Sequence, residues 1–313
     1  MAESLGQTLT QKRLAFDDVF FEIEHEEALG LPRAEQLRLF HTSFRANMLT
    51  TESLQEFIYR NIARYVFSRA TLEDYRINDE MDAAISQALR IMSENGGLEA
   101  VDVGNALDEI MLYAFLEEKL NAPKLMSRVE LGTELSQFKS ECKGVHLLAP
   151  KDLPENTKYQ LVFGASNIVN DVKVAIDRAF ETVLKINKRE NREVVMVQKA
   201  VLDRFFNDDE IALLKSAIIP DQQGKPKEYE TAYGIFLGYK LGLKAEGRGA
   251  EFEELAQKKM LLDIKAHAAY IAQKIKDNHL DGHSFYIYVV PFNDAETEKT
   301  AIMEPVLKGE IVL

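Results

Sequence analysis

The sequence predicts an α/β fold, and three observations predict it. Helical and strand-like segments alternate along the chain beyond residue 99. The stretch 284–292 is apolar at successive positions, which is typical of a strand covered on both faces of a sheet. The segment 171–186 gathers its apolar residues on one helical face, as expected of a helix packed on such a sheet. We therefore expect a mixed sheet flanked by helices, preceded by a helical N-terminal region.

Residues 1–98 are expected to form a mainly helical domain. Spacings of three and four between apolar residues predict helices between 32 and 95. The first of these segments contains Leu37, Leu39, Phe40 and Phe44, the second spans 54–66, and the third spans 79–92. Gly96 and Gly97 then interrupt the pattern, so we place the domain boundary near them. The opening segment 14–23 alternates weakly, which leaves a strand and an extended arm both open.

Residues 99–313 are expected to form the α/β domain. The expected elements are a helix at 105–120, strands at 124–131, 145–149 and 159–164, a helix at 171–186, a strand at 194–197, a helix near 208–218, a strand within 233–241, a long helix at 252–276 and a strand at 284–292. A helix followed by three strands and a helix is the order found in nuclease cores that carry a metal site.

Composition limits the class of protein. With 46% hydrophobic and 28% charged residues, the 313-residue chain is typical of a soluble globular protein. No apolar run approaches the roughly 20 residues of a membrane helix, and the N-terminus has no signal-peptide pattern, so we expect a cytoplasmic protein. One cysteine, Cys142, excludes an intrachain disulfide and a multi-cysteine zinc site.

A net charge of −13 argues against unaided binding to DNA, because proteins usually hold phosphates through clustered Lys and Arg. A partner would then supply most of the affinity. The basic strip 185–189 is a local exception. Two roles stay open for it: a contact with phosphate and a solvated helix end.

The strand at 159–164 leads to the most informative residues. Metal-dependent cleavage of phosphodiesters needs carboxylates that hold Mg²⁺, and commonly a nearby Lys. Residues i and i+2 of a strand share a face, so acid-x-Lys aims both groups at one point. At this place the chain has Ala165, Ser166 and Asn167.

Four stretches carry a resemblance to a known family: VDVGNALDEIMLYAFLEEKLNAPKL, KGVHLL, YQLVFGASNIVNDVKVAIDRAF and HSFYIYVVPFND. Over about 99–313 the sequence resembles HamA, the nuclease-effector component of Hachiman antiphage defence. The resemblance implies a restriction-endonuclease-like fold of the PD-(D/E)xK type, a helicase partner of the HamB type, DNA as substrate and Mg²⁺ as cofactor.

The chain departs from that family at its motif. The family pattern at the strand end is Gly-Glu-Ser-Lys, whereas this chain has Gly164-Ala165-Ser166-Asn167. Ala165 cannot bind a metal, and Asn167 carries no charge. Three explanations stay open at this point: natural loss of catalysis, deliberate inactivation, or relocation of the catalytic groups.

Two acids are candidates for a relocated site. Glu141-Cys142-Lys143 is itself an acid-x-Lys, although so short a motif also occurs by chance at an exposed strand edge. By resemblance, Glu141 matches the first metal ligand of the family. Glu109 shares a helical row with Leu112, Tyr113 and Leu116, and by resemblance matches the acid that the family's first helix directs into the site. A structural salt bridge is the competing role for Glu109.

The histidines are scattered without the spacing of a zinc site. Two roles stay open for His146: a contact with phosphate and a hydrogen-bonded position in the core. Two functions follow from the sequence. The first is a catalytically impaired, HamA-like subunit on a nuclease scaffold, with Glu109 and Glu141 as metal ligands and Lys143, Ala165 and Asn167 at the catalytic positions. The second is a non-catalytic module that restrains or positions a helicase.

Overall fold

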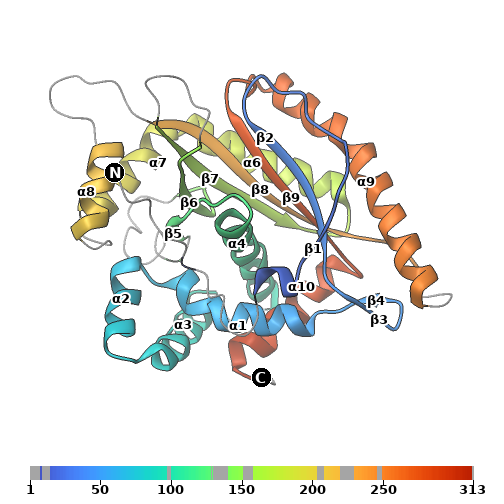
Figure 1. Ribbon diagram of the computed structural model, residues 1–313, viewed down its shortest axis with the longest axis horizontal. Coiled ribbons are helices and arrows are strands. Elements are labelled where there is room, and N and C mark those ends of the chain that lie inside the picture. The colour runs from blue at the N-terminus through green and yellow to red at the C-terminus, as the bar shows by residue number, and fades with distance from the viewer. Residues whose placement is uncertain are drawn as a thin grey trace.

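A seven-stranded mixed sheet forms the centre of the protein in this computed structural model (Figure 1). The structure describes residue 8 and residues 15–96, 100–127, 129, 140–150, 158–202, 208–218, 229–244 and 249–311. The strand order is β1-β2-β9-β8-β7-β6-β5. The strands are β1 (Phe21–Ile23), β2 (Glu35–His41), β5 (Lys124–Ser127), β6 (Gly144–Leu148), β7 (Tyr159–Ile168), β8 (Tyr229–Lys240) and β9 (Ser284–Phe292). The α/β class predicted from the sequence is confirmed.

The sheet is parallel in the middle and antiparallel at both edges. Strands β2, β9, β8 and β7 run parallel to one another. At one edge β1 pairs antiparallel with β2, and at the other edge β5, β6 and β7 form an antiparallel meander. Helices connect the parallel strands, as such crossovers require. A separate two-stranded ribbon consists of β3 (Phe44–Arg45) and β4 (Met48–Leu49).

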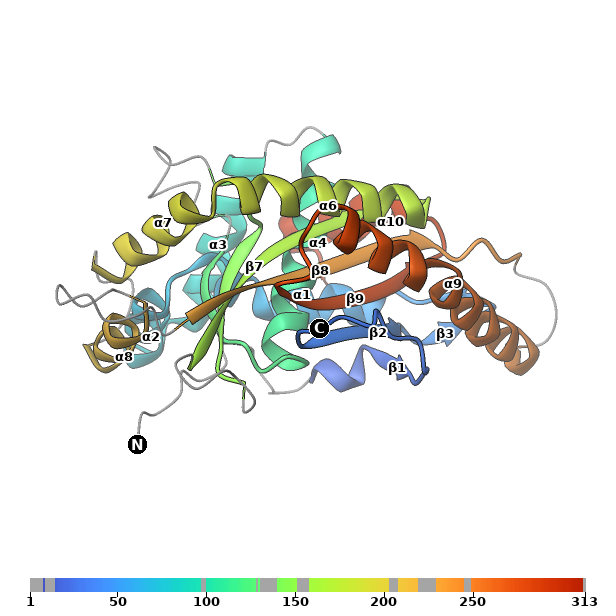
Figure 2. The ribbon, with the colours of Figure 1, turned by 90° about the horizontal axis from the view of Figure 1, so that it is seen from above.

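Helices cover both faces of the sheet (Figure 2). One face carries α6 (Val172–Lys188) and α9 (Gly249–Asp277), with α7 (Glu190–Leu202) and α8 (Asp208–Ile218) beyond the end of α6. The other face carries α4 (Ala100–Glu118) and α10 (Ala295–Lys308). These two helices pack with α1 (Glu52–Val66), α3 (Met81–Gly96) and the short helix η1 (Phe16–Asp18). Helix α2 (Arg69–Ile77) lies beside α3. Two hydrophobic cores result, one on each face.

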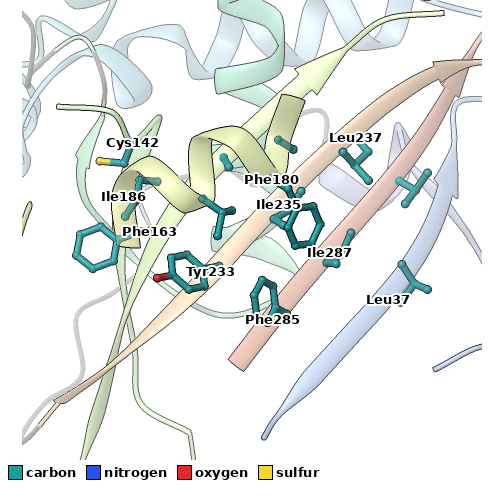
Figure 3. Packing of buried hydrophobic residues seen from close by; sticks show 14 of the residues in the cluster. Leu37, Cys142, Phe163, Phe180, Ile186, Tyr233, Ile235, Leu237, Phe285 and Ile287 are labelled. Atoms are coloured by element: carbon teal, nitrogen blue, oxygen red, sulfur yellow. The ribbon is translucent and has the colours of Figure 1, made fainter. Parts of the chain in front are cut away.

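Figure 3 shows the core beneath α6. Phe180 and Ile186 of α6 point toward Phe163, Tyr233 and Phe285, which come from three adjacent strands. All five side chains are buried. The alternation of each strand sends the intervening residues to the opposite core, which explains why the central strands are apolar at successive positions.

Helix α4 lies unusually close to the sheet because two strand residues lack side chains. A Cβ atom added to Gly164 would stand 2.6 Å from Leu112 Cδ2, and one added to Gly234 would stand 2.6 Å from Leu116 Cδ2. These two glycines are paired across β7 and β8. The close approach brings the polar N-terminal half of α4 to the end of β7.

Two of the expected elements are wrong. The segment with Leu37, Leu39 and Phe40 is strand β2 rather than a helix, because pairing with β9 satisfies its backbone and its side chains alternate between the two cores. The segment 194–197 lies inside α7 rather than in a strand. Val194 and Val197 are buried and Val195 is exposed, which fits a helical period. The opening segment 14–23 contains η1 and β1.

The expected boundary near residue 98 does not separate two cores. Strand β2 precedes it and belongs to the same sheet as β9, which follows it. Residues of α1 and α3 share one hydrophobic cluster with α4 and α10. Gly96 is the last described residue before the gap at 97–99, so Gly97 lies outside the described residues.

Candidate functional site

Glu109 lies at the centre of a buried polar cluster between α4, β7 and α1. Its side chain is largely buried, and its two carboxylate oxygens accept hydrogen bonds from different elements. Tyr65 of α1 donates its hydroxyl to Oε2 at 2.9 Å, and Lys143 donates its ammonium to Oε1 at 2.8 Å. The sequence thus identified a carboxylate that does need a cation and hydrogen bonds to be buried.

Lys143 reaches Glu109 because β7 holds its backbone in place. The residue directly precedes β6, and its N–H donates to the carbonyl of Gly164 at 2.9 Å. Its side chain is only 15% exposed. Two of the residues expected at the site, Glu109 and Lys143, are therefore in direct contact.

Asp108, beside Glu109 on α4, is a second buried carboxylate. Burial raises the pKa of Asp108 to about 6, and the negative charge of Glu109 acts in the same direction. The positive charges of Lys143 and Lys299 and the nearby hydroxyl of Ser166 oppose this rise in the pKa. Asp108 Oδ1 and Ser166 Oγ are nevertheless buried without a well-formed hydrogen bond within the described part of the chain.

The end of β7 sends its residues to both faces of the sheet. Ala165 is fully buried in the core beneath α6, and Ser166 faces α4 and Asp108. Asn167 shares the Ala165 face by strand alternation, and its buried Oδ1 makes no hydrogen bond to any residue described. The structure therefore brings Ser166 to Asp108 and directs Ala165 and Asn167 to the other side of β7.

Glu141 lies in a different set of contacts. Its carboxylate pairs with Arg189, the residue after α6, at 2.6 Å. Its backbone N–H donates to Glu193 of α7, whose carboxylate also accepts a hydrogen bond from Ser140 at 2.6 Å. Glu141 is thus held toward α6 and α7, whereas Lys143, two residues later, is held toward α4.

His146 is a core residue. Its side chain is 1% exposed, and Nδ1 donates to the carbonyl of Ala122 at 2.7 Å. Burial, assisted by the charges of Lys124 and Arg69 and opposed by the bond to Ala122, lowers its pKa to about 3. The ring is consequently neutral at physiological pH, which agrees with a hydrogen-bonded core residue.

The residues in place do not fit a Mg²⁺ ion. Such an ion is usually held by one or two carboxylates together with water and phosphate oxygens. Here Glu109 is bound to an ammonium group and a phenol, Glu141 is bound to Arg189, and position 165 has no carboxylate. Throughout the ranges that the structure describes, no three His, Cys, Asp or Glu side chains gather as a metal site.

Sequence reasoning missed Asp108, Ser166, Tyr65 and Lys299. A usable signal existed for Ser166, since a strand that turns Gly164 toward a helix turns Ser166 the same way. Asp108 stands one position from Glu109 at about 100° around the helix, so the apolar row that identified Glu109 did not include it. Tyr65 and Lys299 are distant in sequence and carry no local signal.

Among the helices described, none is long and apolar enough to cross a membrane. A comparison with family models matches the HamA family over residues 18–306. That match extends the resemblance noted for 99–313 into the N-terminal part, in keeping with the shared sheet and core. The chain matches no curated protein and no solved structure. It therefore belongs to the HamA family and is a subunit of a Hachiman antiphage defence system.

Proposed function

We propose that this chain is a nuclease-fold subunit that meets DNA through a helicase partner and that, in the present sequence, is catalytically impaired. The observation that carries the proposal is the order α4, β5, β6, β7, α6, β8: a helix, an antiparallel meander, and a crossover to a parallel strand. A restriction-endonuclease-like core has this order. Glu109 of the first helix lies on the α4 face of β7, next to Lys143, whereas positions 165 and 167 lie on the opposite face of this strand.

The local geometry of β7 supports a cleavage position at its end. Strand β6 pairs with β7 as far as Val145 and Phe163, so the last residues of β7 extend past this neighbour. We infer that a substrate phosphate would approach the sheet at this extension. Residues 165 and 167 lie in this extension, where the family has its acid and lysine.

The impairment follows from the side chains at those positions. Ala165 has no metal-binding atom, and Asn167 lacks the positive charge that would stabilise a developing negative charge on phosphate. Glu109 is neutralised by Lys143. The groups that Mg²⁺-dependent cleavage needs are therefore either absent or already paired.

Dependence on a partner is supported by the charges. The chain has a net charge of −13, and within the basic strip Arg189 is bound to Glu141. Lys185 and Lys188 are exposed at the end of α6, but two lysines release few counterions from DNA. A helicase that binds DNA would bring the substrate to the end of β7.

The test is a plasmid-nicking assay on the chain purified with its helicase, in the presence of ATP and Mg²⁺. The present sequence should leave the plasmid intact, and the double variant Ala165→Glu with Asn167→Lys should nick it. The uncharged double variant Ala165→Gln with Asn167→Met serves as the matched control and should stay inert. Because Ala165 is fully buried, each variant must first show an intact thermal unfolding transition.

A folded Ala165→Glu, Asn167→Lys variant that does not nick DNA would contradict this assignment of positions. Nicking by the unaltered pair that disappears in Glu109→Gln would contradict the impairment instead.

A second function, restraint or positioning of the helicase without cleavage, is favoured by one specific observation. The candidate acids are all engaged in stable internal pairs, as a structural protein requires: Glu109 with Lys143 and Glu141 with Arg189. The helicase's ATP hydrolysis rate on DNA separates the two functions. A module would change this rate when the chain is added, even where neither form nicks the plasmid.

A further inference from the structure

Helix α9 exposes a short apolar row on the side opposite its buried face. The buried face consists of Phe252, Ala256, Met260, Ile264, Ala268, Ile271 and Ile275. Leu255 and Leu262, two helical turns apart, lie on the outer side, where their exposed fractions are 51% and 55%. Leu261 flanks them and is 37% exposed. We call these three leucines the α9 ridge.

The α9 ridge lies at the margin of the molecule. Both views show α9 along one border, with the sheet on its inner side (Figure 1 and Figure 2). Single leucines on a surface are normal, but three within residues 255–262 form a patch, and apolar patches mark contacts with other proteins. A second helix that buries an apolar row of its own is the simplest structure to cover such a patch.

The charged residues around the α9 ridge change sign along the helix. Glu251 and Glu254 lie in the first turns of α9, and Lys265 lies about one turn beyond Leu262; all three charged residues are exposed. Glu254 and Lys265 make no ion pair within the residues that the structure describes. Two antiparallel copies of α9 would place opposite charges beside each other, whereas two parallel copies would place like charges beside each other.

We propose that the α9 ridge is the contact surface for a second copy of this chain, which packs its own α9 antiparallel to the first about a two-fold axis. The register that brings Leu255 of each copy beside Leu262 of the other buries all four of these side chains. At about 1.5 Å per residue, Glu251 and Glu254 then lie within one turn of Lys265 of the second copy. Apolar burial and opposite charge thus favour the same register.

The contact is expected to be weak for two reasons. Lys258 lies midway between Leu255 and Leu262, so the two copies of this lysine meet near the axis, where like charges repel. Each copy also contributes few large apolar side chains, which is typical of reversible association. A concentration-dependent dimer is therefore expected. Because α9 covers the face of the sheet opposite α4, the pairing takes place away from Glu109.

The experiment is sedimentation velocity of the purified full-length chain, without DNA or helicase, at increasing protein concentration. The unaltered chain should pass reversibly from monomer to dimer. Leu255→Glu with Leu262→Glu should raise the dissociation constant of the dimer at least about tenfold, because pairing would then bury four carboxylates. Val195→Glu is the matched control: Val195 is 49% exposed on α7, and this variant should dimerise as the unaltered chain does.

Charge reversal tests the register. Lys265→Glu alone and Glu254→Lys alone should each weaken the dimer, and the two substitutions together should restore most of the association, because the opposite charges are exchanged. Lys258→Gln should tighten the dimer, because it removes the repulsion at the axis. All of these positions are exposed, so each variant should keep the thermal unfolding transition of the unaltered chain.

Four results would overturn the proposal: a chain that stays monomeric at every concentration, a dimer that persists unchanged in the leucine variant, charge reversal without rescue, or a Lys258→Gln dimer that is no tighter. The first result would assign the α9 ridge to a different protein. The proposal goes beyond the proposed function, and because no nucleic acid or helicase is present in this experiment, its failure leaves the nicking assay to judge that function independently.

Discussion

The buried ring of His146 should make the stability of this protein depend on pH in a defined window. The perturbation is His146→Gln, whose side-chain amide can still donate a hydrogen bond to the carbonyl of Ala122. In the folded protein the pKa of His146 is lowered to about 3, mainly by burial. In the unfolded chain the same ring has a pKa of about 6.5. Between these values the unfolded chain binds a proton that the folded protein excludes.

The sign and size of the effect follow from linkage. The folded state is favoured fully above about pH 6.5, and it loses roughly 1.4 kcal/mol for each pH unit as the pH falls toward 3. At pH 5.0 the loss from His146 amounts to about 2 kcal/mol. Glutamine does not titrate, so the variant lacks this contribution.

Urea unfolding of both proteins at pH 7.5 and pH 5.0 measures the effect. Carboxylates change the stability of both proteins alike, so the difference between the two free energies of unfolding isolates His146. That difference should move by about 2 kcal/mol in favour of the glutamine variant on going to pH 5.0. A difference that stays constant between the two pH values would refute the reasoning and would mean that the folded protein accepts a proton on this ring.

Three further substitutions, the first with a matched control, test packing, a buried charge and a helix cap. Gly164→Ala should lower the free energy of unfolding in urea by about 1–3 kcal/mol, because the added Cβ would meet Leu112 and the sheet backbone. Gly282→Ala is the control: Gly282 has open space around it, so this substitution should change the free energy of unfolding by less than about 0.5 kcal/mol. Lys124→Met should lower the free energy of unfolding by about 3 kcal/mol or more, since the buried ammonium group donates hydrogen bonds to three carbonyls at the end of α1. An unchanged midpoint of urea unfolding would contradict this role. Asp294→Ala should lower the free energy of unfolding by about 1 kcal/mol, because it removes the N-cap of α10. Faster amide hydrogen exchange confined to the first turn of α10 would identify the lost cap as the cause.

Much of the fold could be predicted because its signals are local. Strand β9 was expected at 284–292 and helix α8 at 208–218, and both lie there. Helix α6 was expected at 171–186 and extends from Val172 to Lys188, with Asp171 as its N-cap. In each case the pattern of apolar residues is contained in the segment itself, and α6 in addition has its capping residue directly before it.

Strand β2 shows where local signals fail. The spacing of Leu37, Leu39, Phe40 and Phe44 predicts a helix, yet the first three of these residues lie in β2. Its conformation is decided by β9, about 250 residues later, which supplies the backbone hydrogen bonds of a parallel pair. Pairing between such distant segments leaves no trace in the spacing of either one.

The candidate site shows the same difference between local and long-range signals. By itself the sequence determined the family likeness, the absence of an acid and a lysine at positions 165 and 167, and the presence of a costly carboxylate at Glu109. Only the tertiary structure decided that Lys143 neutralises Glu109, that Glu141 belongs to Arg189, and that Ser166 faces Asp108. The physical reason is that these contacts depend on the register between β6 and β7 and on the rotation of α4, which packing of the whole core sets and no short stretch of sequence encodes.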